Sequence, residues 1–257
     1  NEFAIPIFPK VSFAYKYNDD IIVNTQKQTV HDLNMLPMND YGLVNIKEYY
    51  HEETKNWHNP RLLSINATLP ILTSRGCPFD CNFCCLDKVM GKKMRYKNPK
   101  LVVDEIELLY KEYGHRHFSF FDDNLVIKKS HIIDICNEII RRRLNIQFET
   151  PNGVAVNFID EEVLDMLCMA GLVSLSLPIE HGSDYIRNRI IKKNLLSDKI
   201  HKVVDMTKRY KDLIVRAFFI IGFPEETPET IQATIDMVQM IDVDKPIVNN
   251  LMPYAGT

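Results

Sequence analysis

Residues 74–84 read Ser-Arg-Gly-Cys-Pro-Phe-Asp-Cys-Asn-Phe-Cys and place Cys77, Cys81 and Cys84 in a C-x3-C-x2-C spacing. The stretch follows an apolar segment typical of a buried strand, and its glycine and proline favour a loop. Thiolate is the natural ligand of iron–sulfur clusters, so three cysteines in one loop can hold three irons of a cubane cluster. The fourth iron would then lack a protein ligand and stay open to a substrate or cofactor.

Other interpretations of these cysteines remain open. A structural zinc site needs four closed ligands, commonly as two C-x2-C pairs, and the sequence has no second pair. Cys85 directly follows Cys84 and is expected to point elsewhere. Unrelated core cysteines are disfavoured by the loop-forming residues around them, whereas Cys136 and Cys168 lie on apolar helical faces and are predicted to be core. The clustering within residues 77–85, without a dispersed disulfide framework, predicts a reduced, cytoplasmic compartment.

The composition is that of a globular protein with a full core. The chain has 257 residues, 46% of them hydrophobic and 25% charged, and a net charge of −3 from 31 basic and 34 acidic side chains. Proteins that bind nucleic acid through phosphate neutralisation usually have a basic excess, which is missing here. Apolar stretches reach about ten residues, too short to span a bilayer, and because no basic and apolar leader is in view we expect no signal peptide. We therefore expect no nucleic-acid partner and no membrane association.

From residue 69 onward, short apolar segments alternate with amphipathic ones. Strands are predicted at residues 69–73, 117–121, 146–150, 173–180, 214–221 and 247–252, and a helical pattern follows each of the first five. Such repeats indicate right-handed βαβ units and a parallel sheet, which is an α/β fold. A closed barrel of this kind has eight strands, so either two units lie outside the chain or the barrel is open. In both cases ligands are expected at the carboxyl ends of the strands.

Polar residues mark the starts of three predicted helices. Asp160, Ser197 and Thr227 each precede an apolar stripe at helical spacing, where a side-chain oxygen can accept a free backbone N–H group. In the last of these helices the residues predicted to face inward are Ile231, Ile235 and Val238.

Residues 1–68 lack this alternation. Segments 11–17 and 21–23 flank Asn18-Asp19-Asp20, which predicts a β-hairpin, and the polar stretch that follows has no clear period. We interpret residues 1–68 as a connector that joins or wraps onto a core at residues 69–257. The chain starts with Asn rather than Met, which leaves open that it is a piece of a longer protein.

The cysteine spacing, with Phe83 in the aromatic position before the third cysteine, resembles the defining motif of the radical S-adenosylmethionine (SAM) superfamily. The resemblance covers residues 69–257 and implies that family's partial (β/α)6 TIM-like barrel, open by design. It also implies a [4Fe-4S] cluster on Cys77, Cys81 and Cys84, and SAM chelated to the open iron. Reductive cleavage of SAM would give a 5′-deoxyadenosyl radical. A small-molecule or peptide substrate and an electron donor such as flavodoxin or ferredoxin are the implied partners.

The resemblance also implies SAM contacts in the motif loop and at two strand ends. Phe83 is expected beside the adenine, with ordinary loop packing as the alternative. Phe121-Asp122-Asp123-Asn124 stands where many members carry Gly-Gly-Glu, so Asp122 or Asp123 is expected to contact SAM or substrate. The alternative for these aspartates is an Asx turn or a helix cap. Asn152 follows the third strand and is expected to reach SAM or substrate.

The fourth and fifth strands end in two further motifs. Glu180, followed by His181-Gly182-Ser183, resembles the family's ribose- and methionine-contacting position, and Ser183 and Arg216 are expected at the same cofactor site. The alternative for Glu180 is a rim salt bridge with Arg216. Gly222 is expected to let the backbone approach the adenine. His181 is expected to be a satisfied rim residue rather than a base, so no catalytic acid or base is identified.

The N-terminal segment indicates a branch of the superfamily. It resembles the connector that joins an upstream cobalamin-binding domain to the radical SAM core, at residues 21–24, 33, 36–37 and 49–50, although methylthiotransferases share several features. No Asp-x-His-x-x-Gly motif occurs, so cobalamin would be bound mainly by chain outside this segment. The resemblance implies a cobalamin-dependent methyltransferase acting at an unactivated carbon or phosphorus centre. Alternatives are a cobalamin-free methylthiotransferase or mutase-like enzyme, and a non-catalytic iron–sulfur or zinc-binding module.

Overall fold

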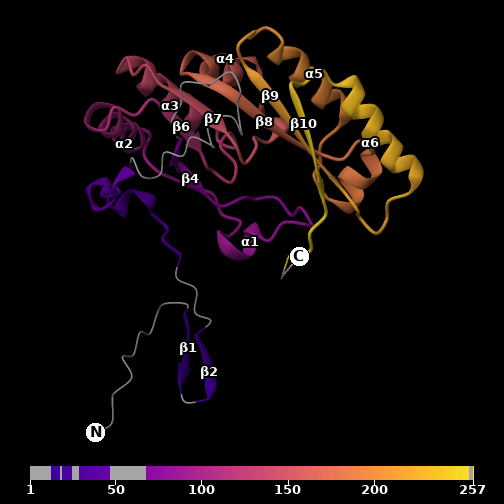
Figure 1. The fold of residues 1–257 in the computed structure, drawn as a ribbon, viewed down its shortest axis with the longest axis horizontal. Coiled ribbons are helices and arrows are strands. Elements are labelled where there is room, and N and C mark those ends of the chain that lie inside the picture. The colour runs from indigo at the N-terminus through magenta and orange to yellow at the C-terminus, as the bar shows by residue number, and fades with distance from the viewer. Residues whose placement is uncertain (1–12, 18, 25–28, 47–67, 255–256) are drawn as a thin grey trace.

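A six-stranded parallel sheet forms the centre of the computed structural model, which describes residues 13–17, 19–24, 29–46, 68–254 and 257. The strand order is β10-β9-β8-β7-β6-β3, so each strand lies beside its successor in the repeat and the sheet stays open between β3 and β10 (Figure 1). The six predicted strands are confirmed, with boundaries moved by no more than two residues: β3 (Leu69–Ile71), β6 (His117–Phe120), β7 (Gln147–Thr150), β8 (Leu172–Glu180), β9 (Ile214–Ile221) and β10 (Lys245–Asn250).

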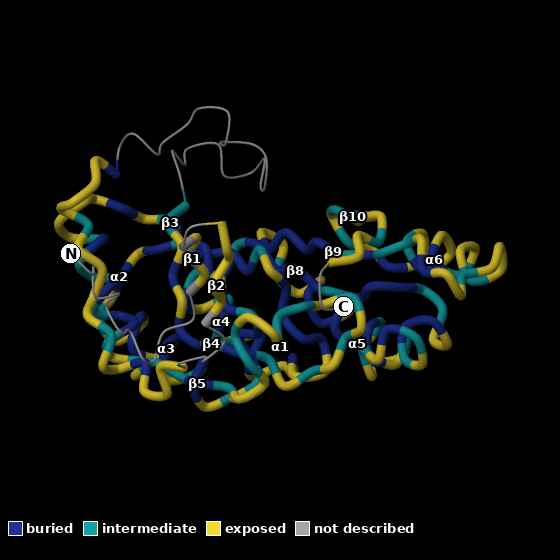
Figure 2. The backbone as a smooth tube through the Cα atoms, turned by 90° about the horizontal axis from the view of Figure 1, so that it is seen from below, coloured by how far each residue is buried: buried dark blue, intermediate teal, exposed yellow. Residues whose placement is uncertain are grey.

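Each strand but the last is followed by a helix. These are α2 (Pro99–Glu112), α3 (Lys129–Arg141), α4 (Glu161–Met169), α5 (Ser197–Thr207) and α6 (Pro228–Met240). Figure 2 shows the buried strands with the helices along them, their outer sides exposed. Fully buried side chains of the helices, such as Ile106 and Leu167, pack with Phe118 and Phe148 of the strands into one core. The result is the predicted open α/β barrel, whose strands all point their carboxyl ends to one edge.

Two of the three predicted helix caps are confirmed. Asp160 accepts the N–H of Val163 at 2.9 Å, and Thr227 forms a capping box with Thr230. The prediction for Ser197 is wrong, because this residue is already inside α5 and its hydroxyl accepts a hydrogen bond from Arg187 instead. A buried guanidinium needs acceptors, and this one recruits the hydroxyl that a helix cap would have used.

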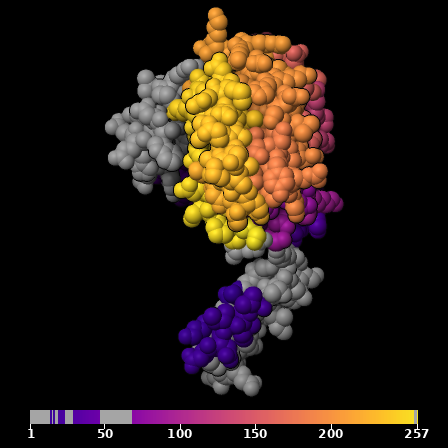
Figure 3. All heavy atoms as spheres, turned by 90° about the vertical axis from the view of Figure 1, so that its right-hand side faces the viewer, coloured from indigo at the N-terminus to yellow at the C-terminus, as the bar shows by residue number. Residues whose placement is uncertain are grey.

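The predicted inward stripe of α6 is partly wrong. Ile231 and Ile235 are 38% and 44% exposed, whereas Thr234 and Met237 are each 3% exposed. Figure 3 shows the yellow, C-terminal part of the chain with α6 and β10 at the surface, where β10 is the edge strand of the sheet. The helix is therefore rotated so that a small hydroxyl residue faces the loop after β8, for a reason given below.

The N-terminal segment forms a β-hairpin and, further along, a hydrogen-bonded contact between residues 39–41 and the core. Strands β1 (Phe13–Tyr17) and β2 (Asp20–Asn24) pair antiparallel, as predicted, and pair with no other described strand. The short 3-10 turns Leu33–Met35 and Tyr41–Leu43 follow, and the rest of the predicted connector, residues 47–67, lies outside the described residues. Among the described residues, every helix is too short or too polar to cross a membrane.

Glu105 of α2 fastens this segment to the core. Its carboxylate accepts hydrogen bonds from the Tyr41 hydroxyl at 2.7 Å, the Asn39 amide at 2.9 Å and the Lys97 ammonium at 2.7 Å. The side chain is buried, so these three donors replace the water that a carboxylate otherwise requires. Glu105 thus joins residues 39–41 to the first β/α unit.

We expect Glu105→Gln to lower the free energy of unfolding by about 2–3 kcal/mol. The neutral amide cannot form the ion pair with Lys97, and its NH2 group would face one of the three donors that now bind the carboxylate. Chemical denaturation measures the change. Glu112→Gln on the exposed end of the same helix is the matched control and should have little effect. Equal stability of the two variants would show that the contacts of Glu105 with Asn39, Tyr41 and Lys97 contribute nothing to stability.

Candidate cluster and cofactor site

The cysteine loop runs from β4 (Ser74–Arg75) to the short helix α1 (Leu86–Val89), and β4 pairs antiparallel with β5 (Arg95–Tyr96). Gly76 opens the loop with a φ of +100°, and a Cβ there would lie 2.6 Å from the carbonyl oxygen of Lys93. Only glycine fits such a close approach. The N–H of Cys77 donates to the carbonyl of Gly91 at 3.2 Å, so the start of the loop is held against residues 91–93.

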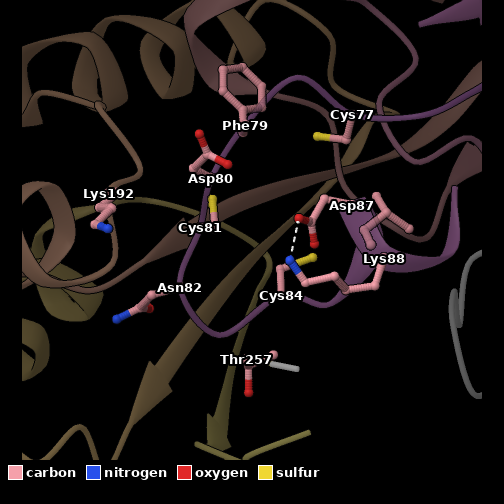
Figure 4. A pocket seen from close by; sticks show the side chains of 11 residues that line it. Cys77, Phe79, Asp80, Cys81, Asn82, Cys84, Asp87, Lys88, Lys192 and Thr257 are labelled. Atoms are coloured by element: carbon pink, nitrogen blue, oxygen red, sulfur yellow. Dashed lines mark hydrogen bonds and ion pairs between the residues drawn. The ribbon is translucent and has the colours of Figure 1, made fainter. Parts of the chain in front are cut away.

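The three cysteines line two adjoining hollows. The outer one, of about 330 Å³, faces solvent and is also lined by Phe79, Lys88 and Lys192 among others (Figure 4). The inner one, of about 170 Å³, lies between the loop and the strand ends. Each cysteine is a free thiol, and Cys85 lines neither hollow, as predicted for a residue that points elsewhere. The loop therefore presents three thiols, and no fourth, to the strand ends.

The donor set fits a cluster better than a single ion. Within the described residues, no three Cys, His, Asp or Glu side chains converge on one metal-sized point, as a structural zinc site would require. A cubane cluster takes one thiolate per iron, so its three cysteines need to surround a larger object rather than touch one ion. Burial raises the pKa of all three thiols, that of Cys81 to about 11. The positive charge of Lys193 offsets part of this increase at each of the three. Loading therefore has to displace protons from the thiols.

The two aspartates after β6 anchor the start of the cysteine loop. The Asp122 carboxylate is 1% exposed and accepts hydrogen bonds from the Thr73 N–H, the Thr73 hydroxyl and the Ser74 hydroxyl, at 2.5 to 3.2 Å. Asp123 accepts the N–H of Gly76 at 3.0 Å and also lines the inner hollow. Asp122 therefore lies behind the loop, outside both hollows that the cysteines line, whereas Asp123 is placed where SAM is expected.

We expect Asp122→Asn to destabilise the fold by about 2–4 kcal/mol and to reduce iron retention, because the amide lacks the charge that strengthens these hydrogen bonds and its NH2 group would face the Thr73 N–H. Thermal unfolding and iron content per chain measure the two effects. Asp134→Asn, at an exposed position of α3, provides the control. Normal iron retention in Asp122→Asn would contradict the prediction that Asp122 holds the start of the cysteine loop in place.

The inner hollow carries a buried ion pair. The Lys193 ammonium lies 2.7 Å from the Glu180 carboxylate, with side chains 16% and 7% exposed. Burial lowers the pKa of Lys193, but Glu180 and the cysteines raise it more, so the net direction is upward and the amine stays charged. A register shift between Pro178 and Glu180 and a φ of +72° at Glu180 turn this residue out of the regular pleat.

A larger hollow of about 580 Å³ continues from the inner one along the ends of β8, β9 and β10. The two share Phe83, Asn152, Pro178 and Glu180. Phe83, Ile220 and Leu251 line this hollow and each packs against a small buried apolar cluster, separate from the main core, of Ile186, Ile191 and Phe223. The path from the cysteines is thus polar and charged at first and then apolar, which suits a ligand with a charged end and a flat neutral end.

The structure brings together half of the eight predicted cofactor residues in one hollow. Phe83, Asp123, Asn152 and Glu180 line the inner hollow with the three cysteines. The Gly222 turn lies at the end of β9, beside Leu251, with a φ of +100°. Ser183 lines none of the three hollows and instead donates its N–H to His181.

Arg216 lies outside these hollows, and the alternative of a salt bridge with Glu180 is wrong. Its guanidinium lies 3.0 Å from the Glu149 carboxylate, which also accepts a hydrogen bond from Ser119 at 2.9 Å. Both ends of this pair are about 4% exposed. Arg216 shares a β9 face with Phe218 and Ile220 but lies further from the carboxyl end, because alternate residues of a strand share a face.

Sequence reasoning missed Lys193 and the apolar pair Ile220 and Leu251. Lys192-Lys193 reads as a solvated charge pair, but left-handed backbone at Lys192 and Asn194 folds the loop so that only Lys193 turns inward. Ile220 could have been found, since it stands two residues before Gly222 on the expected inner face of its strand.

Fold and site together define an iron–sulfur protein on an open parallel β/α barrel. The Radical SAM superfamily matches residues 71–238, so the chain belongs to this superfamily, whose members bind a [4Fe-4S] cluster and SAM.

The chain is also similar to three individual proteins. An uncharacterized methyltransferase of Pyrococcus horikoshii is 28% identical over 96% of this chain and 50% of its own length. The anaerobic magnesium-protoporphyrin IX monomethyl ester cyclase of Cereibacter sphaeroides is 30% identical over 87% of this chain and 35% of its own length. The radical SAM methyltransferase TsrM from Kitasatospora setae, solved with cobalamin and a [4Fe-4S] cluster, has a TM-score of 0.66 at 21% identity, over 72% of this chain and 36% of that one. The chain thus spans half or less of each relative.

Proposed function

We propose that this chain is the catalytic core of a cobalamin-dependent radical SAM methyltransferase, with residues 69–257 as the core and residues 1–68 as the connector. The observation that carries the proposal is the continuous hollow that leads from three thiols, past the Glu180–Lys193 ion pair, to the apolar cluster around Phe83. The methyltransferase name of the Pyrococcus relative and the cobalamin in TsrM support the finer assignment.

Three stretches of the hollow are proposed to bind the cluster, the amino acid end of SAM and the adenine. Cys77, Cys81 and Cys84 would hold the cluster, and with SAM it supplies reductive cleavage and a 5′-deoxyadenosyl radical when bound. Lys193 and Glu180 offer one positive and one negative group to the amino acid end of SAM. Phe83, together with Ile220 and Leu251, offers a dry surface to the adenine.

The far part of the hollow is proposed to admit the substrate. Asn249, Asn250 and Tyr254 provide neutral hydrogen-bonding groups there, beside Phe218 and Met252. We propose a carbon or phosphorus atom of a small molecule or peptide as the methyl acceptor, and a flavodoxin or ferredoxin as the electron donor. Cobalamin would be held mainly by chain outside residues 1–257.

The test uses the full-length protein, purified anaerobically with hydroxocobalamin supplied. We expect bound iron, sulfide and cobalamin, and turnover that yields S-adenosylhomocysteine and 5′-deoxyadenosine in comparable amounts. Iron and 5′-deoxyadenosine without cobalamin would favour the cobalamin-free enzyme. Stoichiometric zinc without iron would leave only a structural metal-binding module.

A further inference from the structure

A buried chain of hydrogen-bonding groups joins the ends of β8 and β9. His181 directly follows β8, and its side chain is 0% exposed; Glu226 lies in the loop after β9, and its side chain is 5% exposed. The His181 Nε2 and Glu226 Oε1 atoms are 3.2 Å apart, and Glu226 Oε2 accepts the N–H of Gly222 at 2.9 Å. One carboxylate therefore contacts both the residue after Glu180 and the turn residue Gly222.

The roles of the His181 nitrogens follow from the backbone. The N–H of Ser183 donates to His181 Nδ1 at 3.0 Å, so this nitrogen is an acceptor and the proton of the neutral ring belongs on Nε2. Burial lowers the pKa of His181, and Glu226 offsets this only in part, so the ring is neutral near pH 7. Glu226 Oε1 lies 3.2 Å from Nε2 and accepts no aligned hydrogen bond from any described residue, so its contact with the ring is electrostatic.

The surrounding packing holds this pair in one place. The N–H of Gly182 donates to the Thr234 hydroxyl of α6 at 3.0 Å, and a Cβ at Gly182 would lie 2.1 Å from the carbonyl oxygen of Ala233. This contact explains why α6 turns Thr234 inward. The buried Arg187 guanidinium donates to the carbonyl of His181, and the Phe223 ring stands edge-on to the imidazole at 6.5 Å.

Both strand ends that the pair connects have unusual backbone. Glu180 has a φ of +72° and follows a register shift at the end of β8, and Gly222 has a φ of +100° and directly follows β9. At Gly222 a Cβ would meet nothing closer than 3.7 Å, so the turn is held by its hydrogen bond rather than by crowding. Loss of the Glu226 carboxylate would free this turn while leaving the cysteine loop untouched.

We propose that His181 and Glu226 are positioning residues that fix the Gly222 turn relative to Glu180 and so preset the adenosine end of the SAM site. Neither residue lines any of the three hollows described above. The inference rests on the proposed function, because it needs the hollow to bind SAM with its adenosine toward β9.

The test compares ligands that contain adenosine with one that does not. Glu226→Gln can satisfy only one of its two donor partners, since its NH2 group must face either His181 Nε2–H or the Gly222 N–H. With the cluster-loaded full-length protein, we expect about 10-fold weaker binding of SAM and of S-adenosylhomocysteine, and methionine binding within about 2-fold of wild type. Iron content should not change. Glu225→Gln, at the exposed neighbouring position, is the matched control.

A double-mutant cycle separates positioning from general loosening. His181→Gln keeps an N–H donor for Glu226 and should retain more SAM affinity than His181→Asn, whose shorter side chain replaces only the Nδ1 acceptor. Each effect should shrink when Glu226 is already Gln. Wild-type SAM affinity in Glu226→Gln, or an equal loss for methionine, would overturn the inference and leave the proposed function standing. A wild-type protein with iron but no SAM binding would overturn both.

Discussion

Replacing Cys77, Cys81 or Cys84 by alanine is expected to reduce bound iron from about four atoms per chain to background. Each thiolate would hold a different iron, so the remaining two cannot compensate for the third, and burial already disfavours the free thiolate at these positions. Iron and sulfide analysis after anaerobic reconstitution, with the brown charge-transfer absorption, measures the loss. Reductive SAM cleavage should disappear with it.

The other cysteines of the chain are matched controls. Cys85 stands next to Cys84 but lines neither hollow, Cys136 is buried in α3, and Cys168 lies in α4. Alanine at any of the three should leave iron content near that of wild type. Iron that survives Cys84→Ala but is lost in Cys85→Ala would mean that the motif register has been misassigned.

Much of the fold can be predicted because hydrophobic pattern and chain topology are local properties. The bounds predicted for the strand at residues 214–221 match β9, since the segment is an apolar run interrupted only by Arg216 and closed by glycine and proline. The wrong stripe on α6 has a long-range cause. Its rotation is set by the contact of Thr234 with Gly182, and no periodicity in the helix itself carries that information.

The site was less predictable for the same reason. The cysteine spacing is contained in eight residues, from Cys77 to Cys84, so the motif stands out in the sequence alone. Asp122 looks like a cofactor ligand by position, but its partners Thr73 and Ser74 belong to a segment almost fifty residues earlier. Its carboxylate is occupied by that segment, which only the three-dimensional arrangement can show.

Replacing Lys193 by methionine is expected to weaken SAM binding by about 10- to 100-fold, the second large effect. The change keeps most of the side-chain volume but removes a charged donor that lies 2.7 Å from Glu180. A hydrogen bond to a charged group contributes about 1.5–3 kcal/mol, and here both partners are largely shielded from water. The Glu180 carboxylate would then remain buried without its cation, facing the end of the hollow where the SAM carboxylate is expected.

Equilibrium binding of SAM to the cluster-loaded full-length protein measures this effect, and 5′-deoxyadenosine formation with dithionite should fall in parallel. Lys193→Arg keeps the charge and should recover part of the affinity, although a planar guanidinium cannot reproduce the position of the ammonium. Lys202→Met, at an exposed position of α5, controls for loss of a lysine as such. Because Lys193 also lowers the pKa of the three thiols, iron content is measured for each variant and SAM affinity is compared among proteins with equal cluster content. Undiminished SAM affinity in Lys193→Met would show that the ion pair only supports the loop, and the amino acid end of SAM would then have to be assigned to other polar groups of the inner hollow, such as Asp123 and Asn152.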